Sequence, residues 1–160
     1  MKTKIFCDIA DYKTIKFFNN KSYVDGFTTN PSLMRLAGAK NYKEYSLKIL
    51  KICKKKPISF EVFGDNSQDM LNQAYEINSW GKNVYVKIPV VNSRGFFTGS
   101  VIEELSNKGI KLNITAVYTF EQTKKIYKKL NKKTKSIISI FAGRMADKGK
   151  DPLPIFKKSI

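Results

Sequence analysis

One lysine lies inside a stretch that otherwise has the composition of a buried β-strand. Residues 83–89 are rich in β-branched and aromatic side chains and end in a proline, which cannot donate a hydrogen bond to a neighbouring strand. Because side chains alternate across a strand, Lys87 shares one face with Tyr85, whereas the aliphatic residues share the other. If the aliphatic face packs on helices, the lysine points into the fold, where an ammonium is costly and tends to lose its proton. A neutral amine can attack a carbonyl and form a Schiff base.

A plainer interpretation of Lys87 is a lysine that ends a strand and extends its ammonium to water. The chain has 30 lysines and arginines, so the residue taken alone favours this interpretation. The wider pattern does not, because polar residues recur in or at the end of six successive predicted strands. They are Asp8, Thr28 and Asn30, Glu61, Lys87, Asn113 and Thr115, and Ser139, with Arg144 after the sixth strand. The interior of a strand should not carry such groups unless others pair with them, and active sites of β/α barrels form at this end of the strands.

Strands and helices are predicted to alternate along the chain. Strands are expected at 5–10, 23–29, 58–63, 83–89, 111–117 and 136–142. Helices are expected at 11–19, at 31–53 with a break at Gly38 and a restart at Asn41, at 67–80, around 101–109, at 120–130 and after Asp151, with caps at Asp11, Ser67, Thr119 and Asp151. This alternation indicates a parallel sheet covered by helices, and both a doubly wound open sheet and a β/α barrel fit. A dinucleotide-binding version is disfavoured, because no glycine-rich phosphate motif follows the first strand.

Length and composition indicate one globular domain. The chain has 160 residues, no apolar run long enough for a membrane span, and no signal-peptide pattern at its start. Cys7 and Cys53 lack metal-like spacing and are interpreted as small apolar residues, which suits a reducing cytoplasm. The chain contains no histidine, which excludes Ser-His-Asp triads, histidine metal ligands and histidine acid–base chemistry.

The formal net charge of +17 raises the question of a nucleic-acid partner. The lysines, however, are scattered over nearly every predicted helix, and the runs at 54–56 and 132–133 fall at element ends. No aromatic-basic RNA-binding signature is present. We therefore expect a lysine-biased surface that helps to steer phosphorylated substrates, with no specific nucleic acid or membrane partner and only nonspecific nucleic-acid affinity at low salt.

The polar residues and their surroundings resemble the transaldolase family. The similar segments are Asp8-Ile9-Ala10, Gly26–Ser32 (GFTTNPS), Glu61-Val62, Val84–Pro89 (VYVKIP), Asn113-Ile114-Thr115 and Ser139–Arg144 (SIFAGR), in the family's order over essentially the whole chain. The Thr-Thr-Asn-Pro-Ser and Val-Lys-Ile-Pro segments are specific when they occur together. The resemblance implies an α/β fold of the (β/α)₈ TIM-barrel type that carries out class I aldolase chemistry, with no metal and no organic cofactor.

The resemblance also implies a role for each polar residue. Lys87 would form the Schiff base with a ketose phosphate, and Asp8 would be the acid/base for carbon–carbon cleavage. Glu61 and Thr115 would hold the water that relays protons to the imine. Sugar hydroxyls or the three-carbon unit would be bound by Thr28, Asn30, Asn113 and Ser139. Arg144 would grip the sugar phosphate, a role that suits a fixed planar cation.

Structural interpretations compete with these roles. Asp8 could cap the turn after the first strand, Thr28 and Asn30 could be turn formers before a proline, Ser139 could be a satisfied strand hydroxyl, and Arg144 could be a surface residue. Phe141 is counted with the substrate-binding residues. The related fructose 6-phosphate aldolases release free dihydroxyacetone. They typically have glutamine at the position of Glu61 and tyrosine at the position of Phe141. Both positions therefore favour transaldolase, which moves a dihydroxyacetone unit between fructose 6-phosphate or sedoheptulose 7-phosphate and aldose phosphates in the pentose phosphate pathway.

The chain departs from the family in length. A β/α barrel usually takes about 200 residues or more, and only six of its eight strands are predicted within residues 1–160. We therefore expect a single, partial barrel domain from a longer transaldolase that forms a homo-oligomer when full length. Alternatives are a fructose 6-phosphate aldolase-type lyase, an inactive partial barrel that acts only as a basic binding protein, an unrelated open α/β protein, or a barrel completed by segment exchange between protomers.

Overall fold

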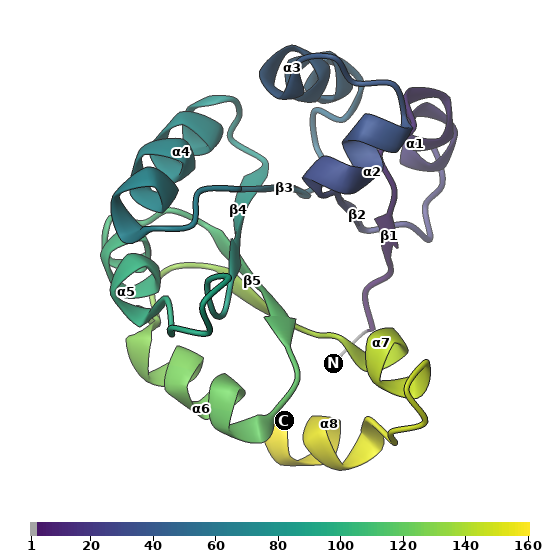
Figure 1. Ribbon diagram of the computed structural model, residues 1–160. Helices are drawn as coiled ribbons and strands as arrows, with labels where there is room; N and C mark the ends of the chain where they lie inside the picture. The colour runs from purple at the N-terminus through teal and green to yellow at the C-terminus, as the bar shows by residue number, and fades with distance from the viewer. Residues whose placement is uncertain (1–2) are drawn as a thin grey trace.

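A computed structural model describes residues 3–160 (Figure 1). Six strands form one sheet in the order in which they occur in the chain, and every neighbouring pair is parallel. They are β1 (Phe6–Asp8), β2 (Gly26–Thr28), β3 (Ile58–Glu61), β4 (Val84–Pro89), β5 (Leu112–Val117) and β6 (Ser136–Ile140). The sheet curls, and the helices lie around its outside (Figure 1). The fold is a partial TIM barrel, as the sequence predicts, and the doubly wound alternative is wrong.

Within residues 3–160, eight helices connect or follow these strands. They are α1 (Tyr12–Asn19), α2 (Pro31–Leu36), α3 (Tyr42–Ile52), α4 (Ser67–Ser79), α5 (Gly99–Asn107), α6 (Phe120–Lys129), α7 (Ala142–Ala146) and α8 (Leu153–Ser159). Two of the predicted caps are confirmed: Asp11 accepts a bond from the Thr14 amide at the start of α1, and Thr119 begins a capping box at α6. Asn41, the predicted restart, caps α3. The predicted break is also confirmed, because Gly38 follows α2 with φ of 86°, a conformation that favours glycine.

Several predicted boundaries are wrong. Asn66, not Ser67, caps α4, because its side-chain oxygen accepts the bond from the Asp69 amide. At the last helix Pro152 is the cap residue, although Asp151 does accept a bond from the Leu153 amide. The sixth strand ends at Ile140 rather than at 142. The short helix α7, which was not predicted from the sequence, begins at Ala142.

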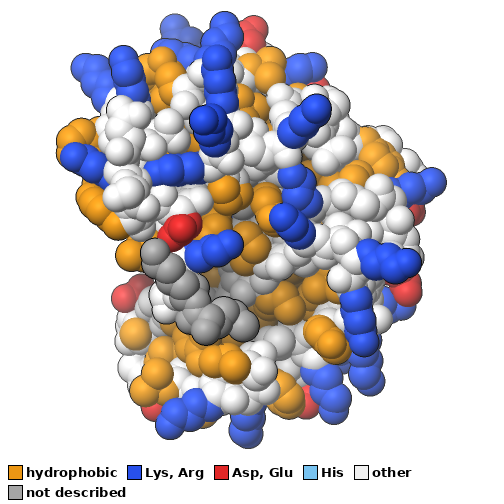
Figure 2. Space-filling model, turned by 180° about the vertical axis from the view of Figure 1, so that it is seen from behind, with side chains coloured by type: hydrophobic (Ala, Val, Ile, Leu, Met, Phe, Trp, Pro, Cys, Tyr) orange, Lys and Arg blue, Asp and Glu red, His pale blue; other side chains and the backbone are white. Residues whose placement is uncertain are grey.

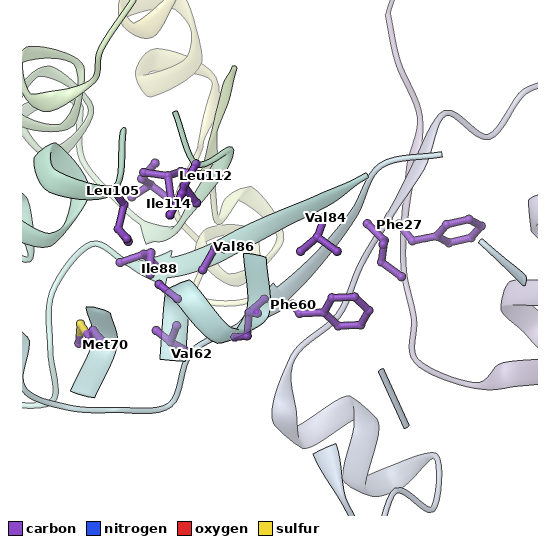
Figure 3. Close-up of a cluster of buried hydrophobic side chains, with 14 of the residues drawn as sticks. Phe27, Phe60, Val62, Met70, Val84, Val86, Ile88, Leu105, Leu112 and Ile114 are labelled. Carbon is purple, nitrogen blue, oxygen red and sulfur yellow. The ribbon is translucent and has the colours of Figure 1, made fainter. Parts of the chain in front are cut away.

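The aliphatic face of the central strands packs against the surrounding helices (Figure 3). Val84, Val86 and Ile88 of β4 are fully buried, and burial of each such side chain contributes roughly 1.5–3 kcal/mol. Figure 3 shows them in line along β4, close to side chains of the neighbouring strands and helices. Because that face is occupied, the alternating residues of β4 must face the inside of the curl, and Lys87 is one of them.

The sheet remains open between its two edges. Within residues 3–160, β1 pairs only with β2 and β6 only with β5. All five residues of β6 are partly exposed, whereas the first three residues of β3 are buried. Lysine and arginine side chains are spread widely over the face in Figure 2 rather than gathered in a single stripe. Among the described residues, no helix has both the length and the apolar character needed to cross a membrane.

Candidate active site

A cavity of about 450 Å³ lies at the carboxyl ends of the strands, inside the curl. Nine of the ten side chains predicted for the site line it, and the tenth, Glu61, contacts Lys87. The nine are Asp8, Thr28, Asn30, Lys87, Asn113, Thr115, Ser139, Phe141 and Arg144. Residues from five different strands and the segments after them therefore meet at one place, because parallel strands end at the same edge of the sheet.

Lys87 is buried beside a carboxylate. Its side chain is 7% exposed, its Nζ lies 3.5 Å from Oε2 of Glu61, and it donates a hydrogen bond of 3.1 Å to the carbonyl oxygen of Thr29. The pairing of β3 with β4 sets Glu61 directly opposite Lys87, which explains the contact. The interpretation of Lys87 as a lysine that extends to water is therefore wrong.

The Glu61 carboxyl lies in a partly buried setting. Burial raises its pKa, the positive charge of Lys87 opposes this change, and the negative charge of Asp8 adds slightly to it. Glu61 thus takes up a proton at a higher pH than an exposed glutamate does. A carboxyl with a raised pKa next to an amine is suited to exchange a proton with it.

Asp8 at the end of β1 and Asn30 just after β2 line the same part of the cavity as Thr28. Asp8 is exposed at the edge of the cavity, and the Thr28 hydroxyl donates to its Oδ1 at 2.6 Å, consistent with their opposed positions in β1 and β2. Asn30 caps α2, because its Oδ1 accepts a bond from the Leu33 amide at 2.8 Å. The side-chain oxygen of Asn30 therefore has a structural role as a helix cap, whereas its NH₂ group can donate a hydrogen bond to a ligand.

A chain of hydrogen bonds crosses the interior near Lys87. The Ser139 hydroxyl donates to Oδ1 of Asn113 at 2.7 Å, and Nδ2 of Asn113 donates to the Ser59 hydroxyl at 3.0 Å. The bonds fix the orientation of the fully buried Asn113 side chain. Ser59 was not predicted from the sequence, although it lies two residues before Glu61 and so shares its face of β3.

Thr115 presents a buried hydroxyl to the cavity. The residue is 1% exposed, and its Oγ1 has no hydrogen-bond partner among residues 3–160. The next residue, Ala116, has φ of 58°, and the pairing of β5 with β6 is irregular between Ile114 and Val117. A buried hydroxyl is normally satisfied, so this one indicates a place for a bound water or ligand.

The far wall of the cavity is formed by the end of β6 and by α7. Phe141 lies edge-on to Tyr118, with ring centroids 5.7 Å apart. Arg144 is exposed at the mouth, where Asp147 also lines the cavity. Asp147 directly follows α7 as its C-cap residue, and it was missed because this segment was predicted to be strand and loop. Among residues 3–160, no group of three or more His, Cys, Asp or Glu side chains could hold a metal ion.

Residues 5–158 match the sequence model of the Transaldolase/Fructose-6-phosphate aldolase family. The chain belongs to this family. It is 35% identical to a "Probable transaldolase" of Streptococcus agalactiae serotype V over 96% of this chain and 67% of that protein. It is 36% identical to a "Probable transaldolase" of Methanococcus maripaludis strain C5 over 92% of this chain and 64% of that protein.

A less similar relative is matched over a similar share of its length. A "Probable transaldolase" of Herpetosiphon aurantiacus is 30% identical over 96% of this chain and 65% of that protein. The chain therefore spans about two thirds of the length of these relatives. Family membership and the partial barrel agree with the resemblance found from the sequence motifs.

Proposed function

We propose that this chain carries out transaldolase chemistry, in which Lys87 forms a Schiff base with a ketose phosphate and transfers a dihydroxyacetone unit. The observation that supports this most directly is the buried Lys87 amine, 3.5 Å from the Glu61 carboxyl and on the wall of a polar cavity. The proposal includes fructose 6-phosphate or sedoheptulose 7-phosphate as donor and an aldose phosphate as acceptor, in the pentose phosphate pathway of the cytoplasm.

Formation of the Schiff base requires Nζ to give up a proton and then bond to the ketone carbon. The Glu61 carboxylate is within reach to accept that proton. Nζ must then give up a second proton, while the ketone oxygen gains two protons and leaves as water, which yields a positively charged imine. The unpartnered Thr115 hydroxyl is suited to hold a water that carries these protons, together with Glu61.

Carbon–carbon cleavage requires a base for the hydroxyl next to the breaking bond. Asp8 lines the same cavity and is the carboxylate that we assign to this step. As it accepts the hydroxyl proton, the aldose phosphate leaves as an aldehyde, and the bonding electrons move to the imine to form an enamine on Lys87. The reverse steps add the enamine to the acceptor and free Lys87 by hydrolysis.

The remaining side chains would bind the sugar. Arg144 at the mouth is suited to the phosphate, since a guanidinium pairs with phosphate oxygens in a planar, two-pronged manner. Asn30 and Thr28 would contact hydroxyls, while Asn113, whose orientation is held by Ser139, would contact the three-carbon unit. Glu61 and Phe141 distinguish this proposal from a fructose 6-phosphate aldolase-type lyase, because the resemblance implies glutamine and tyrosine there in the lyase branch.

Borohydride trapping followed by peptide mass spectrometry tests the proposal. Incubation with fructose 6-phosphate, or with dihydroxyacetone alone, should leave a reduced three-carbon adduct on Lys87. Lys87→Met should abolish the adduct, whereas Lys111→Met should retain it, because Lys111 donates to the Lys82 carbonyl outside the cavity. Absence of an adduct on Lys87 with both compounds would defeat the proposal. Glyceraldehyde 3-phosphate release that continues without an acceptor would favour the lyase.

A further inference from the structure

The hydroxyl of Tyr42 bridges both main-chain groups of Glu61. The Glu61 amide donates to the Tyr42 Oη at 2.9 Å, and the same hydroxyl donates to the Glu61 carbonyl oxygen at 3.0 Å. Tyr42 is the first residue of α3, and Glu61 is the last residue of β3. A helix of the outer layer thus holds the strand end that carries the partner of Lys87.

The geometry of the sheet explains why Glu61 needs this support. The last residue of β2, Thr28, pairs with Ser59, and the Thr29 amide donates to the Ser59 carbonyl. Main-chain groups of a strand point alternately to its two neighbours, so those of Glu61 point to the side of β2. β2 does not extend as far as the level of Glu61, because α2 begins at Pro31. The Tyr42 hydroxyl takes the place of the missing strand partner.

The Tyr42 side chain is itself held in place. Its ring lies edge-on to Phe63, with centroids 5.4 Å apart, and 6.0 Å from the ring of Trp80. Burial is the main cause that raises the pKa of Tyr42 well above its usual range, so the phenol remains protonated. A neutral phenol can accept one bond and donate another at the same time, which is what the Glu61 main chain requires.

We propose that Tyr42 is a positioning residue: its hydroxyl fixes the main chain of Glu61 so that the carboxylate meets the Lys87 amine. Its effect on catalysis rests on the proposed function, but the positioning itself does not. Tyr42 lies outside the cavity lining and touches no reacting atom. Loss of its hydroxyl should therefore act on the rate of the chemical step more than on substrate binding.

Tyr42→Phe removes only the bridging oxygen, and Tyr45→Phe is a matched control. Tyr45 lies on the same helix, and its hydroxyl donates to the Ala10 carbonyl at 3.1 Å rather than to Glu61. In the transfer assay, we expect Tyr42→Phe to lower kcat about tenfold or more while KM changes less than about twofold, since small misplacements of catalytic groups are costly. Tyr45→Phe should keep both values near those of the unchanged chain.

A second measurement does not depend on activity. In NMR spectra of Tyr42→Phe, exchange of the Glu61 amide with solvent should rise about tenfold or more, and the contact between Glu61 side-chain and Lys87 ε protons should weaken. Unchanged exchange and an unchanged contact would overturn the positioning role, as would a fall in kcat shared by Tyr45→Phe. A chain without any Lys87 adduct would defeat the proposed function instead, and the NMR result would still decide the role of Tyr42.

Discussion

Ala116 adopts a backbone conformation that alanine avoids, and this gives a prediction with a definite sign. Its φ of 58° lies in the left-handed region, where a Cβ atom costs about 1–2 kcal/mol. Glycine removes this cost. It also makes the unfolded chain more flexible, which lowers the gain in stability by about 0.4–1 kcal/mol. Ala116 is partly exposed, so loss of its methyl group removes only a fraction of the ~0.8 kcal/mol of a buried methylene. We expect Ala116→Gly to raise the free energy of unfolding by about 0.5 kcal/mol.

Ala146 provides the control. It is the exposed last residue of α7, where the same change to glycine should lower the free energy of unfolding by up to about 0.5 kcal/mol, less than in a helix interior. The two substitutions should therefore change the free energy of unfolding in opposite directions, which urea unfolding monitored by circular dichroism tests. If Ala116→Gly destabilises the chain as much as Ala146→Gly does, the strain at Ala116 is not real. We further expect Ala116→Gly to lower activity, because the constrained backbone keeps the Thr115 hydroxyl on the cavity wall.

Two further predictions follow from single side chains. Thr115→Val replaces a buried, unpartnered hydroxyl by a methyl group of similar shape. We expect the free energy of unfolding to be retained or raised by about 1 kcal/mol while turnover falls. A loss of stability with unchanged turnover would contradict this. Asp11→Ala removes the cap of α1 and should lower the free energy of unfolding by about 1 kcal/mol at pH 7. The Thr14 hydroxyl and amide lower the pKa of Asp11, so the capping stability is present above the ordinary value of 3.8 and is lost as pH falls through the lowered pKa. Thermal unfolding of the unchanged chain and of Asp11→Ala should be followed from pH 7 to pH 2. The difference in their stability should shrink only at the acid end of this range.

The predictions that rest on side-chain alternation were correct. Lys87 faces the cavity because Val84, Val86 and Ile88 are buried on the other face, and a period of two leaves no other choice. The same reasoning should have identified Ser59 from the position of Glu61. Cap residues were less certain, because neighbouring polar residues such as Asn66 and Ser67 are both able to begin a helix.

The predictions that failed depend on contacts between distant segments. Residues 141 and 142 continue an apolar run and favour a strand, yet β6 stops where its pairing with β5 ends at Val117. The amide of Phe141 still bonds to the Val117 carbonyl, after which the chain turns into α7. Asp147 came into the cavity through this turn, and no local pattern around it indicated that position.

Residue types and local spacing were sufficient to predict alternating strands and helices, the inward face of the strand that carries Lys87 and most of the polar side chains near the cavity. These properties depend on backbone geometry that repeats every two or 3.6 residues, so they can be read within a short stretch. The contact of Glu61 with Lys87, the bonds of Asn113 to Ser59 and Ser139, and the bridge from Tyr42 to Glu61 follow from strand register and helix packing. They join residues that are 19 to 54 positions apart, and only the folded chain determines which of many polar partners come within hydrogen-bond distance.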